Sequence, residues 1–194
     1  MRFIENGPNI PDELLEARDK GEVIFICGAG VSIPAGLPSF ATLARKVIAD
    51  LGVSKGHRAH FLLDRALNAD EDDYAPPMDQ IFNLLKRDYG AILVEQAVFK
   101  RLKKPKGASL THHETILNLS ADVNGNPRLV TTNFDILFEA ARKKTKKYIA
   151  PELPDFTAVQ EFEGIVYLHG RLPLQSIYGN FCPSEAFASL EPQW

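Results

Sequence analysis

The sequence predicts an α/β fold: a Rossmann-like parallel sheet with helices on both faces and an inserted helical module. Three observations predict it. A glycine-rich turn joins a short apolar segment, residues 23–27, to a stretch of helical spacing, residues 40–51. Two further short apolar segments, 128–132 and 165–168, each end in polar residues. Helical patterns occupy the stretches between these segments, as the long crossovers of a parallel sheet require.

The first expected strand, Val23-Ile24-Phe25-Ile26-Cys27, is apolar throughout and rich in β-branched residues. A run of about four to eight such residues is typical of a strand buried on both faces. Gly28-Ala29-Gly30 follows it directly. Glycines at a strand-to-helix turn let the backbone approach a bound phosphate closely, although a lone Gly-x-Gly is equally typical of a tight connection.

Two helices are expected around this strand. Residues 9–20 have helical spacing and end at Gly21. Residues 40–51 carry a second apolar stripe, with Ser39 as the expected N-cap and Gly52 as the expected C′ residue. Together the strand, the glycine turn and the second helix form one unit.

The stretch from residue 55 to about residue 108 contains no convincing strand and is expected to be a helical insertion. Helical spacing covers residues 60–67, 79–87 and 91–102, and the acidic and proline-rich segment 68–77 predicts a loop. One helix suffices for a crossover between parallel strands. The extra helices therefore indicate a lid or a small module.

The remainder of the chain returns to the sheet. The expected elements are a helix at 109–121, a turn at 124–127, a strand at 128–132, a helix at 136–143 and a strand at 165–168. Thr111, followed three residues later by Glu114, gives the nominal pattern of a helix cap. Beyond them, residues 176–181 have the pattern of a short strand and residues 183–190 that of a helix start.

Three strands are clear, whereas a doubly wound nucleotide domain has about six. We therefore expect a sheet whose second half is truncated. Residues 1–194 are expected to form one domain, as a fragment or as the N-terminal domain of a longer protein.

Composition narrows the class of protein. The net charge of −3 gives no general attraction for nucleic acid or for an anionic membrane, so we expect direct contact with neither. No signal peptide and no apolar run of about 20 residues is present, which predicts a cytoplasmic protein. Cys27 and Cys182 are the only cysteines, so a four-cysteine zinc site cannot be built and no zinc is expected.

The three expected strands end in patches that carry chemistry: Gly28-Ala29-Gly30, Thr131-Thr132-Asn133-Phe134-Asp135, and His169-Gly170. In an open parallel sheet, ligands bind beyond the carboxyl ends of the strands, so these patches are expected to surround one pocket. Each patch also has an ordinary structural reading, in which Asp135 caps a helix, Asn133 forms a turn and His169 makes a hydrogen bond at a strand end. Their coincidence at three strand ends favours a site.

These motifs resemble the signatures of the sirtuin family, in order and at similar spacing. The matching segments are Gly28-Ala29-Gly30-Val31-Ser32, Gly36-Leu37-Pro38-Ser39-Phe40, Thr131-Thr132-Asn133-Phe134-Asp135 and Leu168-His169-Gly170. The resemblance covers about residues 20–170 and is closest to bacterial sirtuin-like domains that hydrolyse NAD, including those of anti-phage defence proteins. It implies a Rossmann-like sheet with NAD in a cleft beside a helical module.

The resemblance also implies roles for individual residues. Asn133 would lie against the nicotinamide ribose and help to hold the attacking water, and His169 would be the base acting on the ribose hydroxyls. Asp135 would contact the carboxamide. The residues implied to bind NAD are Gly28, Ala29, Gly30, Ser32, Pro38, Phe40, Thr132 and Asp135.

Two departures from the family pattern bear on the reaction. Deacylating sirtuins carry a four-cysteine zinc module, and they follow the proline of the first motif with Asp-Phe-Arg, where this chain has Ser39-Phe40-Ala41. Both departures favour hydrolysis of NAD to nicotinamide and ADP-ribose over protein deacylation. With the resemblance to anti-phage defence proteins, this predicts an effector that depletes NAD. The alternatives are an NAD-dependent protein deacylase and a non-catalytic module that binds NAD or ADP-ribose. Control by self-association, or by a partner protein or further domain, is expected in the first case.

Two weaker patterns are interpreted as ordinary solvent-exposed surface. His112-His113-Glu114 lacks the spacing of a metal site, so a solvated helix face is expected there. The basic clusters at residues 100–106 and 142–147 could touch nucleic acid or an acidic partner, and solvation of helix ends is the favoured interpretation.

Overall fold

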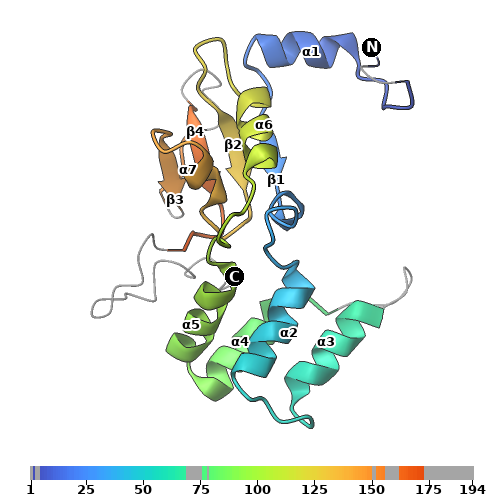
Figure 1. Ribbon diagram of the computed structural model, residues 1–194, viewed down its shortest axis with the longest axis vertical. Helices are drawn as coiled ribbons and strands as arrows, with labels where there is room; N and C mark the ends of the chain where they lie inside the picture. Colours follow the sequence, from blue (N-terminus) through green and yellow to red (C-terminus); the bar gives the residue numbers. More distant parts are fainter. Residues whose placement is uncertain are drawn as a thin grey trace.

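The computed structural model describes residues 2, 5–68, 76–77, 79–149, 152–155 and 162–172. Within them, four parallel strands form one sheet, in which β1 pairs with β2, β2 with β4, and β4 with β3 (Figure 1). The strands are β1 (Phe25–Cys27), β2 (Arg128–Thr131), β3 (Lys147–Ile149) and β4 (Gly164–Tyr167). The predicted α/β class and Rossmann-like parallel sheet are confirmed.

Seven α-helices accompany the sheet in the described residues, together with a short 3₁₀ turn, η1, after β1. They are α1 (Asp12–Asp19), η1 (Ala29–Val31), α2 (Phe40–Asp50), α3 (Arg58–Asn68), α4 (Asp79–Tyr89), α5 (Ala91–Leu102), α6 (Thr111–Leu119) and α7 (Leu137–Ala141). The strand expected at 176–181 and the helix expected at 183–190 lie outside the described residues, as does most of the loop expected at 68–77.

Helix α2 has the ends that its sequence predicts. The Ser39 side chain accepts a hydrogen bond from the Thr42 amide at 3.3 Å, which caps the start of the helix. After the helix, Gly52 has a φ of +62°, the left-handed conformation that a C′ glycine adopts readily. The apolar stripe between these ends is buried at Leu43, Ala44, Val47 and Ile48.

Helices α2 to α5 pack on one another and form a helical module at the carboxyl end of the strands (Figure 1). The module differs from the expected insertion of about 55–108 because it begins at Phe40. The apolar stripe of α2 packs against α3, α4 and α5, so α2 belongs to the module. Phe134 and Leu172, which follow β2 and β4, join the same core and connect the module to the sheet.

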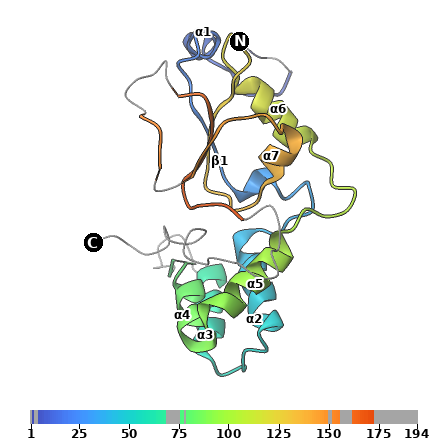
Figure 2. The same cartoon turned by 90° about the vertical axis from the view of Figure 1, so that its left-hand side faces the viewer.

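The two faces of the sheet are covered differently. Leu117 of α6 and Phe138 of α7 pack with Leu129 and Ile165 on one face, where Figure 2 shows both helices side by side. On the other face Val130 and Val166 pack against Phe162. Helices were expected on both faces of the sheet. In the described residues, α6 and α7 cover the face that carries Leu129 and Ile165.

Strand β1 corrects one expectation from the sequence. It was expected to be buried on both faces, but Ile26 is 75% exposed and Ile24 is 37% exposed. The reason is its position: among the described strands, β1 lies at an edge of the sheet and pairs only with β2. An apolar run predicts a strand, but not its place in the sheet.

Strand β3 has no counterpart in the sequence prediction. It is three residues long, Lys147-Tyr148-Ile149, and follows a basic cluster, so it lacks the apolar run that marks the other strands. Its register with β4 pairs Lys147 with Ile165. Long-range pairing, rather than local sequence, makes it a strand.

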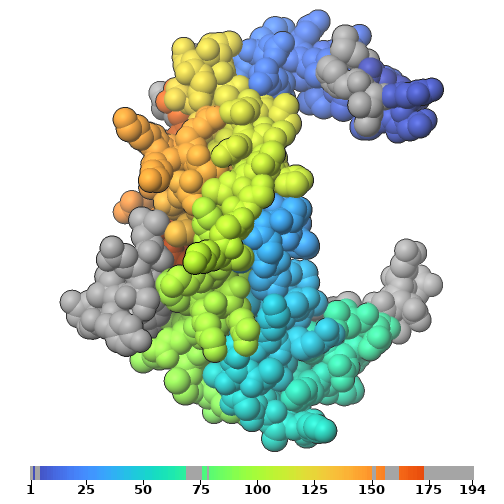
Figure 3. All heavy atoms as spheres, viewed as in Figure 1, coloured from blue at the N-terminus to red at the C-terminus, as the bar shows by residue number. Residues whose placement is uncertain are grey.

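Two helix starts differ from the sequence prediction. Thr111 is the first residue of α6 rather than its cap, and the residue before it, Leu110, makes no side-chain capping bond. Helix α1 begins at Asp12, three residues after the expected start at residue 9. No residue of α1 is buried, and Figure 3 shows α1 (blue) extending away from the body of the molecule.

Among the described helices, none combines the length and the apolar character needed to cross a membrane.

Candidate functional site

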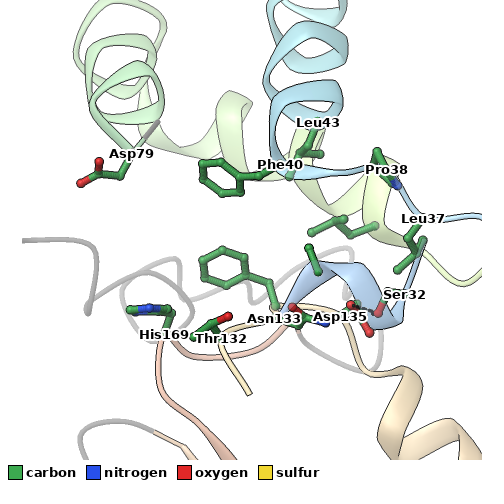
Figure 4. A pocket seen from close by; sticks show the side chains of 13 residues that line it. Ser32, Leu37, Pro38, Phe40, Leu43, Asp79, Thr132, Asn133, Asp135 and His169 are labelled. Atoms are coloured by element: carbon green, nitrogen blue, oxygen red, sulfur yellow. Dashed lines mark hydrogen bonds between the residues drawn. The ribbon is translucent and has the colours of Figure 1, made fainter. Parts of the chain in front are cut away.

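A cavity of about 580 Å³ lies where the strand ends face the helical module (Figure 4). Residues from both parts of the molecule line it: Ala29, Ser32, Leu37, Pro38, Phe40, Leu43, Asp79, Leu102, Thr132, Asn133, Phe134, Asp135 and His169. The three strand-end patches predicted to share one pocket therefore meet. Of the predicted site residues, Gly28 and Gly30 are not part of the cavity wall itself.

Backbone hydrogen bonds hold the strand ends in place. The Thr132 amide donates to the Cys27 carbonyl at 3.1 Å, and the Leu168 amide donates to the Thr131 carbonyl at 3.0 Å. The Leu172 amide donates to the Phe134 carbonyl at 2.7 Å. The segments after β1, β2 and β4 are thus tied together on both sides of His169, and the parallel register brings their polar residues to one edge.

The glycines of the first motif are not required by the protein's own conformation. Gly28 has a φ of −113°, which any residue adopts, and Gly30 is not among the glycines with positive φ. A Cβ at Gly30 would meet no atom within 4 Å, and one at Gly28 would make ordinary contact with Thr132 at 3.6 Å. Close approach of a ligand to this loop is a physical reason for glycine there.

Four buried polar side chains form a cluster at the cavity: Ser32, Asn133 and Asp135 line the wall, and His113 lies behind it. We call it the Ser32 cluster because the Ser32 hydroxyl is its centre. Ser32 Oγ donates to Asp135 Oδ2 at 2.8 Å and accepts from Asn133 Nδ2 at 3.2 Å. It also lies 3.2 Å from His113 Nε2. All four residues are less than 7% exposed.

Both carboxylate oxygens of Asp135 are engaged within the protein. Oδ2 accepts from Ser32, and Oδ1 accepts from the Leu137 amide at 3.0 Å at the start of α7. Burial raises the pKa of Asp135, an effect that the bonds from Leu137 and Ser32 partly offset. Ile136, not Asp135, has the N-cap position of α7, so Asp135 is not the expected cap; it lies one residue before the cap, binds the Leu137 amide and also borders the cavity.

The polar atom that Asn133 leaves to the cavity is its carbonyl oxygen. Its Nδ2 group donates to Ser32, and its backbone amide donates to Thr131 Oγ1 at 3.1 Å. Oδ1 has no hydrogen-bond partner among the described residues. Asn133 thus faces the cavity as a hydrogen-bond acceptor, the polarity needed to orient a water molecule through one of its protons.

His113 corrects a second expectation. Its segment was expected to be a solvated helix face, but the His113 side chain is 0% exposed, whereas its neighbour His112 is exposed. One sequence pattern could have revealed it: His113 lies four residues before Leu117, so the two share the buried face of α6. Burial lowers the pKa of His113, and the imidazole is neutral near pH 7.

The helical-module wall of the cavity is largely apolar. Phe40 packs against Phe82 with ring centroids 5.3 Å apart, and Leu43 and Leu102 lie beside them. Asp79, at the start of α4, is the one carboxylate on this side among the described lining residues. Figure 4 shows Phe40 and Asp79 across the cavity from His169 and Thr132. One wall is therefore mainly polar and the other mainly apolar.

The described lining residues include no lysine and no arginine. A bound phosphate would therefore be held by backbone amides, such as those of Ala29 and Gly30, which make no hydrogen bond to the described residues. No group of three or more His, Cys, Asp or Glu side chains in the described residues is placed to hold a metal ion. The absence of zinc remains a prediction.

Comparison with known proteins gives one similarity. The chain is 34% identical over 179 residues to the uncharacterized protein y4cA of Sinorhizobium fredii, a match that covers 89% of this chain. This chain spans 14% of the length of that relative. No family model and no solved structure matches the chain.

Proposed function

We propose that this chain hydrolyses NAD to nicotinamide and ADP-ribose. The observation that carries the proposal is the meeting of Asn133 and His169, from the ends of β2 and β4, in one cavity beside the Gly28–Ser32 loop. The sirtuin-like motifs imply this set of residues. The cavity supports the proposal because residues so far apart in sequence gather around one space.

The chemistry requires a shielded pocket and a positioned water molecule. Nicotinamide in NAD is a cationic leaving group, and its departure leaves positive charge on the ribose. Phe40, Leu43 and Leu102 give this space one apolar wall, which would shield the reacting ribose from bulk water once NAD is bound. Asn133 Oδ1 orients one water by accepting its hydrogen bond, and an asparagine does so without titrating.

His169 is the proposed base. It lies half-buried in the turn after β4, and its ring centroid is 6.4 Å from that of Phe134. The neighbouring Gly170 has a φ of +78°, so the chain turns immediately after the imidazole. Histidine accepts a proton near neutral pH, and general base assistance contributes roughly 10²–10⁴-fold to a rate.

Nicotinamide release from NAD, with and without an acetylated peptide, tests the proposal. We expect release that does not depend on the peptide and is lost in Asn133→Ala and in His169→Ala. Asn124→Ala and His112→Ala are matched controls, because both residues are exposed and outside the cavity. These two variants are expected to keep the wild-type rate.

Two other results would overturn the proposal. Strict dependence on the peptide would identify a deacylase. Binding of NAD in calorimetry, without any turnover, would identify a non-catalytic binding module. The biological role that we propose for the hydrolase is depletion of NAD in anti-phage defence. Its activity would be controlled by self-association, by a partner protein or by a further domain.

A further inference from the structure

His113 contacts the site without lining it. The residue lies 81 positions from Ser32 in sequence, yet its Nε2 atom is 3.2 Å from Ser32 Oγ. Its ring packs edge-on against Phe138, with centroids 4.8 Å apart. A fully buried imidazole that touches the centre of a hydrogen-bonded cluster has a defined orientation, and the sequence motifs assign it no role.

The hydrogen atoms at Ser32 Oγ determine which nitrogen of His113 carries a proton. A hydroxyl has one proton to donate and two lone pairs that accept. Ser32 uses its proton on Asp135 Oδ2 and one lone pair on Asn133 Nδ2. The contact with His113 must therefore use the second lone pair, so Nε2 carries a proton and donates it.

The other ring nitrogen is consistent with this assignment. His113 Nδ1 is buried and has no hydrogen-bond partner among the described residues. An unpartnered Nδ1 that carries only a lone pair costs less free energy than an unpartnered Nδ1–H, whether that N–H belongs to a neutral ring or to a positively charged one. The lowered pKa of His113 agrees with a neutral ring.

We propose that His113 is a positioning residue: its Nε2–H fixes the Ser32 hydroxyl, which in turn holds the Asn133 amide with its carbonyl oxygen toward the cavity. Without that N–H, the Ser32 hydroxyl can rotate and the Asn133 amide can flip. A flipped amide presents an NH₂ group to the cavity. It would then donate to a water molecule instead of accepting from it, so the water would no longer be oriented through one of its own protons.

Histidine variants and a matched control separate positioning from simple packing. His113→Leu fills the space without a donor, whereas the side-chain nitrogen of His113→Gln can take the place of Nε2. His112→Gln is the control, because His112 is the exposed neighbour on α6. We expect kcat for NAD hydrolysis to fall roughly ten- to hundredfold in His113→Leu with KM unchanged, and to recover most of its value in His113→Gln.

Equal activity of His113→Leu and wild type would overturn the proposal, as would equal losses in the Leu and Gln variants. This kinetic arm rests on the proposed NAD hydrolysis. Nitrogen-15 NMR of the histidine rings tests the proposal independently of NAD hydrolysis. In the protein without NAD, it is expected to show His113 as the neutral Nε2–H tautomer. A proton on Nδ1 alone would overturn the assignment even if NAD is hydrolysed.

The side-chain NH₂ of Asn133 provides a second readout without substrate. Its protons are expected to exchange slowly in wild type and in His113→Gln, and faster in His113→Leu. If wild type releases no nicotinamide but shows this pattern, the proposed function fails while the positioning role stands. Unchanged exchange in His113→Leu would contradict the role of His113 in holding Asn133.

Discussion

The cavity edge of the sheet and its β3–β4 side both bury polar groups, but they do so in different ways. At the cavity edge, the Ser32 cluster is joined by hydrogen bonds around one hydroxyl. On the β3–β4 side, Glu139 of α7 forms ion pairs with Lys147 at 3.1 Å and Arg171 at 3.4 Å. We call these three residues the Glu139 cluster; none of them lines the cavity.

Both clusters leave a buried polar atom without a hydrogen-bond partner among the described residues: His113 Nδ1 in the Ser32 cluster and Arg171 Nε in the Glu139 cluster. In the Ser32 cluster, Asp135 uses both oxygens and Ser32 uses its proton and both lone pairs. Beside the Glu139 cluster, the Tyr167 hydroxyl is buried without a hydrogen-bond partner among the described residues, and burial raises its pKa. The Ser32 cluster borders the cavity, whereas the Glu139 cluster connects α7 with β3 and with the segment after β4.

Each region contains one glycine whose replacement tests the difference between them, and Gly164 is expected to give the larger loss of stability. Gly164 has a φ of +128°, and a Cβ there would clash with the Lys146 carbonyl oxygen. Gly164→Ala should lower the free energy of unfolding by about 3 kcal/mol or more, because strain of roughly 1–3 kcal/mol adds to a clash with backbone. Urea unfolding measures it.

Gly30→Ala is the matched substitution at the cavity edge. It should leave the free energy of unfolding unchanged or raise it by up to about 1 kcal/mol, because alanine restricts the unfolded chain and meets no neighbour. NAD binding, measured by calorimetry, should weaken if the glycine serves a ligand. A large loss of stability in Gly30→Ala, or none in Gly164→Ala, would show that the two glycines do not differ as the structure indicates.

An intermediate effect is expected from Glu139→Gln. The substitution keeps the volume but removes the charge that pairs with Lys147 and Arg171. The free energy of unfolding should fall by roughly 1–3 kcal/mol, as is typical of hydrogen bonds to charged groups. Denaturation against Glu114→Gln, which removes an exposed charge from α6, isolates the effect of burial.

Nicotinamide release per folded molecule should stay at the wild-type level in Glu139→Gln, since the Glu139 cluster does not reach the cavity. A selective loss of activity with unchanged stability would show that this cluster, too, orients the site through Arg171.

The smallest effect concerns pH. Burial lowers the pKa of His113 below its ordinary value of 6.5, although nearby Asp135 opposes the shift and His112 adds to it. The unfolded chain then binds a proton more readily than the folded protein. Stability from this group is therefore complete above pH 6.5 and declines as the pH falls below it, by at most about 1.4 kcal/mol per pH unit.

His113→Gln should remove this dependence, and His112→Gln should keep it. Free energies of unfolding at several pH values between about 5 and 7 provide the measurement. Asp135, whose pKa burial raises above 3.8, contributes in the opposite direction, since its stabilisation declines as the pH rises above that value. The difference between wild type and His113→Gln therefore isolates the histidine. Parallel pH curves for the two proteins would contradict a buried, neutral His113.

Much of the fold follows from local sequence. Apolar residues at helical spacing predict α2 to α5, and Ser39 and Gly52 predict the ends of α2, because capping depends on bonds between residues a few positions apart. The meeting of Ala29, Asn133 and His169 follows as well. Parallel strands place their carboxyl ends at one edge, so the order of motifs along the chain predicts a shared pocket.

The remaining features depend on contacts between residues far apart in the chain. An apolar run did not reveal that β1 lies at an edge with Ile26 exposed, and the short polar segment of β3 became a strand only by pairing with β4. Nor did a pair of histidines reveal which one meets Ser32. Sequence periodicity determined which elements form, and tertiary packing decided which side chains are buried together, because burial depends on partners that no local pattern encodes.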